Sequence, residues 1–327
     1  MVFKVGLSRD LLTPDGTPSF GLGPLSVLEA EPGLQWEFLP ESLSEITQEV
    51  AADYDGLYVN SPRVTAHSVG REDCRVRIVA RHGVGYDSVD VAALNARGVM
   101  VTNTPIAVRR PVAVAILTLI FALAGRLLAK DRLIRAGHWN QRNGLMGLGL
   151  TKRTLGVIGA GGIGRELLAL ARPFGWKMLA VDPYVEDSIL RNLGAEPMVL
   201  DDMLHQSDFV VVTCLLNEKT RHMMDARRFS LMKPGAFFIN VARGPVADEA
   251  ALIAALHEGA IAGAGLDVFE QEPVADDNPL LRMDQVILAP HCLSWTDECF
   301  DAIAREGLTC ITDFARGHQP HSVVRPS

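Results

Sequence analysis

The stretch 154–183, TLGVIGAGGIGRELLALARPFGWKMLAVDP, constrains the fold of this chain more than any other part of the sequence. Gly159, Gly161 and Gly164 form a G-x-G-x-x-G pattern between an apolar run and an amphipathic segment. The first glycine of such a pattern permits a tight turn, the second lets a pyrophosphate approach the backbone, and the third lets a helix pack closely on a strand. The pattern therefore predicts a strand, a turn and a helix that bind a dinucleotide.

The same stretch indicates which dinucleotide binds. Gly162 and Ile163 fall in the first turn of the expected helix, where unpaired N–H groups and the positive end of the helix dipole attract phosphates. Asp182 ends the next expected strand, and its carboxylate would accept hydrogen bonds from the hydroxyls of the adenosine ribose. Because a carboxylate repels a 2′-phosphate, the sequence favours NAD over NADP.

Short apolar runs alternate with helical segments through most of the chain. The expected strands are FKVGLSR, LQWEFLP, GLYVN, VRIVAR and VMVTNTP in the first part, and TLGVIG, KMLAVD, FVVVTCL, AFFINVA, GAGLDVF and QVILAP in the second. Near-continuous apolar strands are typical of parallel sheets that helices cover on both faces. The sequence therefore predicts an α/β protein with two doubly wound parallel-sheet domains.

Two helices help to set the expected domain boundaries. A long helix is expected from about Pro111 to Lys130, since proline suits a first helical turn. A last helix, roughly 296–316, precedes no further strand of the second series, so we expect it to pack back on the N-terminal region. The predicted domains are a dinucleotide-binding domain over 103–293 and a smaller, discontinuous domain over 1–102 and 294–327.

The composition argues against several classes of protein. With 31 basic and 39 acidic residues and a net charge of −8, the chain is not expected to bind nucleic acid. Its most apolar run is shorter than the ~20 residues of a membrane span, and the N-terminus lacks the apolar core of a secretory signal. The five cysteines form no CxxC pair, which argues against a disulfide framework or a metal site. We expect a cytoplasmic protein.

Three polar residues, Arg243, Glu272 and His291, follow three successive expected strands. Ligands of parallel sheets bind at the carboxyl ends of the strands, so the three side chains are expected to share a site. Histidine suits proton exchange near neutral pH, and the planar guanidinium of arginine binds a carboxylate through two hydrogen bonds. Glu272 would orient His291 and favour its protonated form. Taken singly, Arg243 could cap a turn or make a surface ion pair, Asp267 could be a structural turn acid, and Glu270 competes with Glu272.

With these motifs the chain resembles the D-isomer-specific 2-hydroxyacid dehydrogenases, which include phosphoglycerate, glycerate, D-lactate and formate dehydrogenases. The blocks MKPGAFFINVARGPVADEAALIAALHEGAIAGAGLDVFEQEPV and NPLLRMDQVILAPH carry the resemblance together with the glycine pattern and its acid. The resemblance implies hydride transfer between NAD and a small D-2-hydroxy acid or 2-keto acid. It also implies a homodimer, and an active-site cleft between a Rossmann domain and a flavodoxin-like substrate domain.

The resemblance also assigns roles to individual residues. It makes Arg243 the ligand of the substrate carboxylate, Glu272 the partner of the histidine, and His291 the acid/base. Further residues are assigned to the cofactor or to the substrate: Asp267 near the nicotinamide, Cys214 and Ala242 in cofactor loops, Val84 and Gly85 in the loop RHGVGYDSVD that holds the substrate carboxylate, and Trp295 at the mouth of the pocket.

Departures from the family pattern narrow the choice of substrate. Asn60 stands where phosphate-using members tend to have a basic residue, so a phosphoglycerate substrate is not expected. Arg109 and Arg110 lie unusually close to the expected cleft, where either could contact a second anionic group. Three alternatives stay open: a glyoxylate or hydroxypyruvate reductase that works mainly in the reducing direction, a formate dehydrogenase, which Glu272 argues against, and an NAD-sensing protein like the corepressors that keep this fold.

Overall fold

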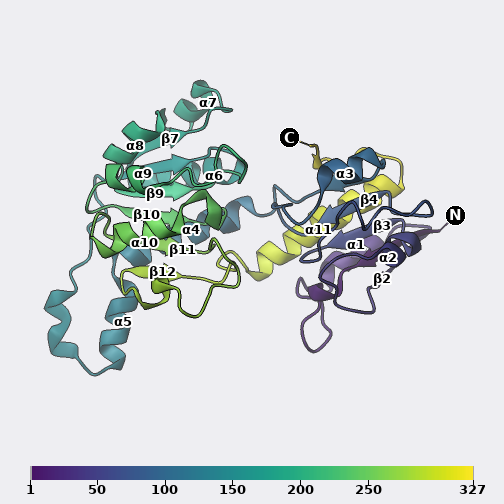
Figure 1. Cartoon of the computed structure of the whole chain (residues 1–327), viewed down its shortest axis with the longest axis horizontal. Coiled ribbons are helices and arrows are strands. Elements are labelled where there is room, and N and C mark those ends of the chain that lie inside the picture. Colours follow the sequence, from purple (N-terminus) through teal and green to yellow (C-terminus); the bar gives the residue numbers. More distant parts are fainter. Residues whose placement is uncertain (1, 327) are drawn as a thin grey trace. The chain divides into compact units, whose positions relative to one another are not determined.

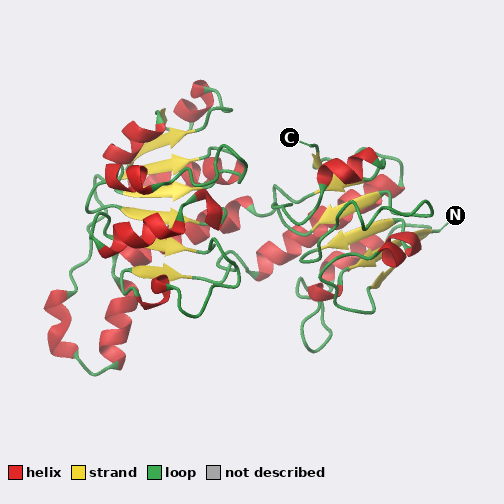
Figure 2. Ribbon diagram, viewed as in Figure 1, coloured by secondary structure: helices red, strands yellow, loops and turns green. Residues whose placement is uncertain are grey.

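The computed structural model describes residues 2–326 and divides the chain into two compact units (Figure 1). The terminal unit contains the residues up to Val108 and those from Trp295 onward, and the central unit runs from Arg109 to Ser294. Each unit has its own parallel sheet with helices packed on it (Figure 2). The structure thus confirms the predicted class, two doubly wound α/β domains.

The sheet of the terminal unit has the strand order β13-β5-β4-β3-β1-β2. Its strands are β1 (Phe3–Leu7), β2 (Leu34–Phe38), β3 (Gly56–Val59), β4 (Ile78–Arg81), β5 (Met100–Thr102) and β13 (Val323–Val324). The first five strands pair in parallel in the flavodoxin-like order, and β13 adds an antiparallel edge beside β5. Four helices accompany them: α1 (Ser26–Glu29), α2 (Gln48–Asp53), α3 (Val91–Ala96) and α11 (Asp297–Ala315).

The last helix, α11, belongs to the terminal unit. Thr296 caps its N-terminus by accepting a hydrogen bond from the Cys299 N–H at 3.1 Å. The buried face of α11, which includes Leu308 and Ile311, shares one core cluster with Leu7 and Tyr58 of the sheet. This burial of apolar surface holds the second segment of the chain on the first.

The sheet of the central unit has the order β12-β11-β10-β9-β6-β7-β8, and all of its strands are parallel. The strands are β6 (Thr154–Ile158), β7 (Lys177–Val181), β8 (Ala195–Pro197), β9 (Phe209–Val212), β10 (Phe237–Asn240), β11 (Gly263–Leu266) and β12 (Val286–Leu288). The order reverses between β6 and β9, and this is the switch point where doubly wound sheets bind ligands.

Helices cover both faces of this sheet. They are α4 (Arg109–Ala124), α6 (Gly162–Ala171), α7 (Asp187–Asn192), α8 (Leu200–Gln206), α9 (Ala226–Leu231) and α10 (Glu249–His257). Successive residues of a strand point to opposite faces. In β9, Phe209 and Val211 therefore pack in one core cluster with α4 and α6, whereas Val210 and Val212 pack in another with α8, α9 and α10. Two buried faces explain why β9 is apolar at every position.

The prediction of one helix from Pro111 to Lys130 is wrong. The segment forms two helices, α4 and α5 (Leu127–Arg135), which are bent by 59° at Gly125 and Arg126. Arg126 has the left-handed φ of 51°, and the Leu148 N–H donates to the Ala124 carbonyl at 2.7 Å, which satisfies an end carbonyl of α4 from outside the helix. The edge strand β8 is not predicted from the sequence either, because its three residues contain no apolar run.

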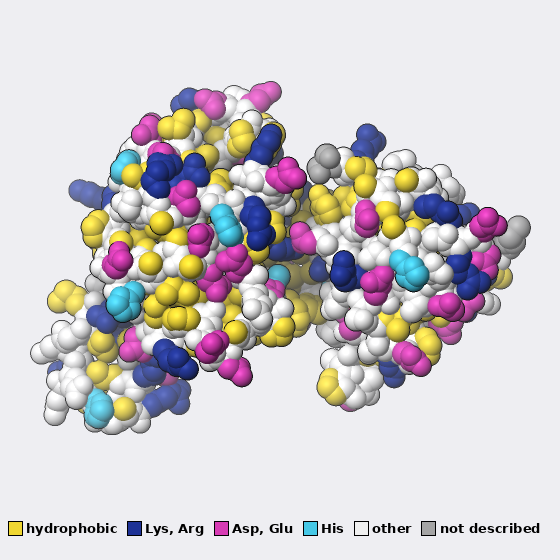
Figure 3. Space-filling view, in the orientation of Figure 1, with side chains coloured by type: hydrophobic (Ala, Val, Ile, Leu, Met, Phe, Trp, Pro, Cys, Tyr) yellow, Lys and Arg dark blue, Asp and Glu magenta, His cyan; other side chains and the backbone are white. Residues whose placement is uncertain are grey.

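None of the helices in the described part of the chain is by itself long and apolar enough to cross a membrane; α4 and α5 meet the length and composition criteria only as the bent pair. Basic and acidic side chains are interspersed on the visible face of each unit (Figure 3), and several form ion pairs, such as Arg227 with Asp201 at 2.8 Å.

Candidate active site

The glycine-rich turn joins β6 to α6 at the switch point of the central sheet. Gly159 has a φ of 95°, and a Cβ there would collide with the backbone of Cys214. A Cβ on Gly164 would collide with the carbonyl oxygen of Gly159, so these two glycines close the turn onto the helix. On Gly161, by contrast, a Cβ would meet nothing within 4 Å. The turn therefore leaves its outer side open beside the N-terminus of α6, which fits a bound pyrophosphate.

Asp182 supports this turn from the end of β7. Its Oδ2 accepts a hydrogen bond from the Ala160 N–H at 2.7 Å, and its Oδ1 accepts one from the Tyr184 N–H at 2.9 Å. The hydroxyl of Thr213 holds the other side of the turn by donating to the Gly159 carbonyl at 2.6 Å. The carboxylate predicted to bind the ribose is thus fixed next to the glycine turn while remaining partly exposed.

Glu272 and His291 meet at the carboxyl ends of β11 and β12. Nδ1 of His291 lies 2.8 Å from Oε2 of Glu272, and Oε1 of Glu272 accepts a hydrogen bond from the Phe269 N–H at 3.0 Å. Burial by itself would raise the pKa of the Glu272 carboxyl. Its hydrogen bonds to His291 and Phe269, with the charge of Arg243, hold that pKa below the ordinary value instead. Glu272 therefore carries a negative charge toward the imidazole throughout the neutral range.

The backbone around His291 is held in a strained conformation. His291 has a φ of 55°, and its N–H donates to the Ala289 carbonyl at 3.1 Å. Asp267, which is buried at the end of β11, accepts the N–H groups of Cys292 at 2.9 Å and Leu293 at 3.1 Å. Burial raises the pKa of Asp267, although these hydrogen bonds oppose the shift. Such strain persists where surrounding contacts over-determine it, and here the contacts orient the histidine.

Arg243 follows β10 in a turn that Asn240 shapes. Asn240 is 2% exposed, its Nδ2 donates to the Arg243 carbonyl at 2.9 Å, and its Oδ1 accepts the Ala242 N–H at 3.1 Å. A Cβ on Gly244 would collide with the Phe269 carbonyl, so this glycine lets the arginine turn pack directly on the loop of Glu272. Asn240 is not among the site residues predicted from the sequence; its signal there is a polar side chain at the end of an apolar strand.

Glu270, the competitor of Glu272 in the sequence, is engaged elsewhere. Its Oε1 lies 2.6 Å from Nε2 of His222, and its Oε2 accepts the Glu249 N–H at 3.3 Å. The two glutamates thus pair with two different histidines. Glu272, two residues farther along the loop, pairs with the one at the end of β12.

The remaining predicted site residues lie in both units. In the terminal unit, Val84 and Gly85 follow β4, where the Val84 carbonyl accepts a hydrogen bond from Asn103 at 2.8 Å. Trp295 is 61% exposed and packs edge-on against Phe300 at 5.1 Å. In the central unit, Cys214 lies against Gly159 of the glycine-rich turn, and burial raises the pKa of its thiol to about 11.

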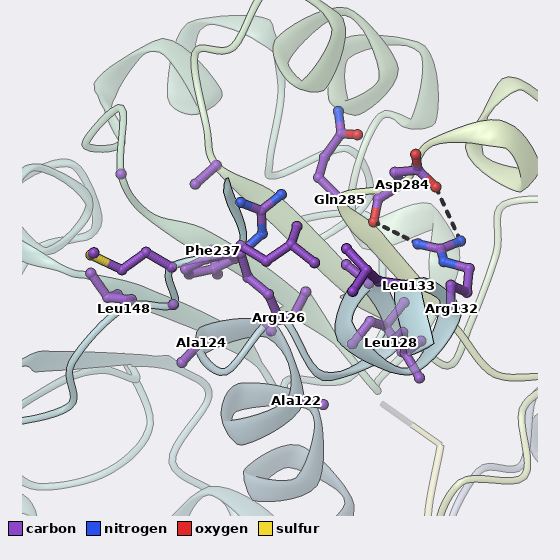
Figure 4. Close-up of a pocket in the computed structure, with 18 of the residues that line it drawn as sticks. Ala122, Ala124, Arg126, Leu128, Arg132, Leu133, Leu148, Phe237, Asp284 and Gln285 are labelled. Atoms are coloured by element: carbon purple, nitrogen blue, oxygen red, sulfur yellow. Dashed lines mark hydrogen bonds and ion pairs between the residues drawn. The ribbon is translucent and has the colours of Figure 1, made fainter. Parts of the chain in front are cut away.

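A cavity of about 860 Å³ in the central unit lies away from these residues (Figure 4). It is lined by α5, by the segment around Leu148, and by Phe237 and Gln285, which stand at or before the amino-terminal ends of β10 and β12. An ion pair between Arg132 and Asp284, 3.0 Å apart, crosses its rim. Because parallel sheets bind substrates at the carboxyl ends of their strands, this cavity is not the candidate active site.

Comparisons with known proteins agree with the geometry of the central unit. Residues 117–292 match the family model described as D-isomer specific 2-hydroxyacid dehydrogenase, NAD binding domain. The chain is 38% identical over 296 residues to a glyoxylate reductase of Thermococcus onnurineus, covering 88% of each chain, and 36% identical over 308 residues to one of Pyrococcus furiosus, covering 92% and 91%. This chain belongs to the D-isomer-specific 2-hydroxyacid dehydrogenase family.

A solved structure supports the same assignment over nearly the whole chain. The crystal structure of a glyoxylate reductase from Paecilomyes thermophila superimposes with a TM-score of 0.85 at 26% identity and covers 99% of both chains. The protein is therefore an oxidoreductase that transfers a hydride between NAD and a small 2-hydroxy acid or 2-keto acid.

Proposed function

We propose that the protein works mainly as a reductase of small 2-keto acids of the glyoxylate and hydroxypyruvate type, with His291 as the proton donor. The observation that carries this proposal is the 2.8 Å contact between Glu272 and His291 at the ends of adjacent strands. Relatives over most of the chain are named glyoxylate reductases, which favours the reducing direction and a small substrate.

The roles of the three polar residues follow from their chemistry. Bound NADH supplies the hydride. The Arg243 guanidinium binds the carboxylate of the keto acid, because its planar donors match the two carboxylate oxygens. Since Nδ1 of His291 is bound to Glu272, Nε2 is the nitrogen that donates a proton to the carbonyl oxygen as it becomes a hydroxyl. Glu272 stabilises the protonated imidazole before this transfer and keeps the ring oriented.

We also propose that NAD is preferred over NADP. Asp182 stands at the end of β7 beside the glycine turn, and its negative charge would repel a 2′-phosphate at the ribose position.

We further propose that the protein is a cytoplasmic homodimer. Helix α5 has no buried residue, and Leu127, Leu128 and Ile134 on it are 58%, 44% and 51% exposed. Apolar side chains gathered on one exposed helix support a contact with a second copy of the chain. The five cysteines are free thiols, which supports a reducing compartment.

Replacing the histidine tests the proton donor. We expect the wild-type protein to consume NADH with glyoxylate or hydroxypyruvate, and His291→Gln to lower kcat by about 10²–10⁴-fold, the usual contribution of a positioned general acid. NADH binding, followed by fluorescence, should stay close to wild type. Near wild-type turnover in the variant would disprove the role of His291. A wild-type protein that binds NADH but reduces no 2-keto acid would support the sensor alternative.

Replacing the glutamate tests its pairing with the histidine. Because Glu272 is ionised across the neutral range and lies 2.8 Å from Nδ1 of His291, it fixes the imidazole ring for proton transfer. We expect Glu272→Gln to lower kcat by about tenfold or more, the size of a lost charge-assisted hydrogen bond, with little change in NADH binding. Glu270→Gln, which disturbs the contact with His222 instead, is the matched control and should keep the wild-type kcat. An unchanged kcat in Glu272→Gln would refute the pairing.

Replacing Asp182, the acid beside the glycine turn, tests the cofactor preference. We expect Asp182→Ala to raise the ratio of kcat/KM with NADPH to kcat/KM with NADH by about tenfold or more, because the repulsion of the 2′-phosphate is removed. Affinity for NADH should fall as well, since the Ala160 N–H loses its acceptor. Asp187→Ala, an exposed acid on α7, serves as the control. If the ratio did not change, the ribose role of Asp182 would be wrong.

A further inference from the structure

Arg109, the first residue of α4, lies across the glycine-rich turn. A Cβ placed on Gly162 would stand 2.6 Å from Nε of Arg109 and 3.1 Å from its Cδ. The arginine side chain therefore occupies the side of residue 162 where any other residue would project its own side chain. Gly162 is the first residue of α6, so the guanidinium group reaches the helix terminus that forms the phosphate site.

We propose that Arg109 is a phosphate-binding residue of the dinucleotide site, which adds a full positive charge beside the glycine-rich turn. The other arginine at this turn, Arg165, donates from Nε to the Ala160 carbonyl at 2.9 Å. The proposal rests on the dinucleotide-binding role of the turn and extends it to a residue of another helix. Gly159, Gly161, Gly162 and Gly164 offer a pyrophosphate only backbone N–H groups and the partial charge of the helix dipole. A guanidinium group adds a full charge and planar donors that suit phosphate oxygens.

The packing of α4 on α6 fixes the position of Arg109. Ala113, Ile116 and Leu117 of α4 share a buried core cluster with Leu167 and Leu168 of α6. The start of α4 is therefore held beside the start of α6 by apolar packing, whatever else the arginine contacts. Gly161, Gly162 and Arg109 are all exposed, so a ligand can reach them.

Electrostatics favours an anion at this place. A positive charge beside the positive end of a helix is unfavourable, whereas a bound pyrophosphate attracts both the guanidinium group and the helix terminus. The neighbouring Arg110 is placed differently, because its Nη1 lies 3.1 Å from Oε1 of Glu166 on α6. The two adjacent arginines thus form a natural pair of test and control.

The experiment compares Arg109→Ala with Arg110→Ala in the full-length protein. Dissociation constants are measured by calorimetry for NADH, for ADP, which has a diphosphate, and for adenosine, which has none. We expect Arg109→Ala to weaken NADH and ADP by about tenfold or more, the size of a lost charge-assisted hydrogen bond, and to leave adenosine unchanged. Arg110→Ala should bind all three ligands like the wild type.

A second variant keeps the arginine and moves it. In Gly162→Ala the new methyl group displaces the guanidinium group, so NADH and ADP should again weaken while adenosine does not. This variant decides the question if Arg109→Ala does not fold, as judged by its thermal melting.

Two results would overturn the proposal. One is Arg109→Ala binding NADH and ADP within about twofold of wild type. The other is an unchanged affinity for NADH with a raised KM for the keto acid, which would place Arg109 on the substrate instead. The binding constants are measured without turnover, so they are independent of the proposed function. Failure of the proposed function would appear differently: the protein would bind NADH but would not oxidise it with any 2-keto acid.

Discussion

The parallel pairing of the strands in the central unit is the constraint on which the rest of the site depends. Because β6 and β9 to β12 all run in one direction, the turns that follow them emerge at a single edge of the sheet. The glycine turn, Arg243, Glu272 and His291 come from four such turns. None of these residues needs to be near another in the sequence, and each is positioned by the strand that precedes it.

Close backbone approach then brings the turns together. Gly159 and Gly164 close the phosphate turn, and Gly244 lets the turn of Arg243 pack directly on the loop of Glu272. Buried polar side chains then hold two of the turns through hydrogen bonds. Asn240 holds the turn of Arg243, and Asp267 holds the turn after His291. The side chains of His291 and Glu272 remain partly exposed, with exposed fractions of 46% and 38%. A rigid backbone thus presents accessible side chains, the arrangement that acid/base chemistry requires.

The sequence predicts most of this fold because apolar runs mark buried parallel strands, and it predicts candidate polar residues because such strands end where ligands bind. It does not predict features that depend on contacts between distant segments. The break between α4 and α5 follows from the left-handed backbone of Arg126 and from a hydrogen bond donated by the Leu148 N–H. Neither feature is predicted by the local sequence. Glu270 and Glu272 are distinguished by their surroundings, because Glu270 contacts His222 whereas Glu272 contacts His291. The placement of Arg109 over Gly162 likewise comes from helix packing.

The stereochemistry of the product shows whether these strand ends form the hydride-transfer site of a D-2-hydroxyacid dehydrogenase. The measurement is chiral chromatography of the product formed from hydroxypyruvate and NADH by the wild-type protein. We expect a single enantiomer, because Arg243 and His291 would present one face of the keto acid to the hydride, and we expect it to be D-glycerate, because the family is specific for the D-isomer. L-glycerate or a racemic product would contradict it.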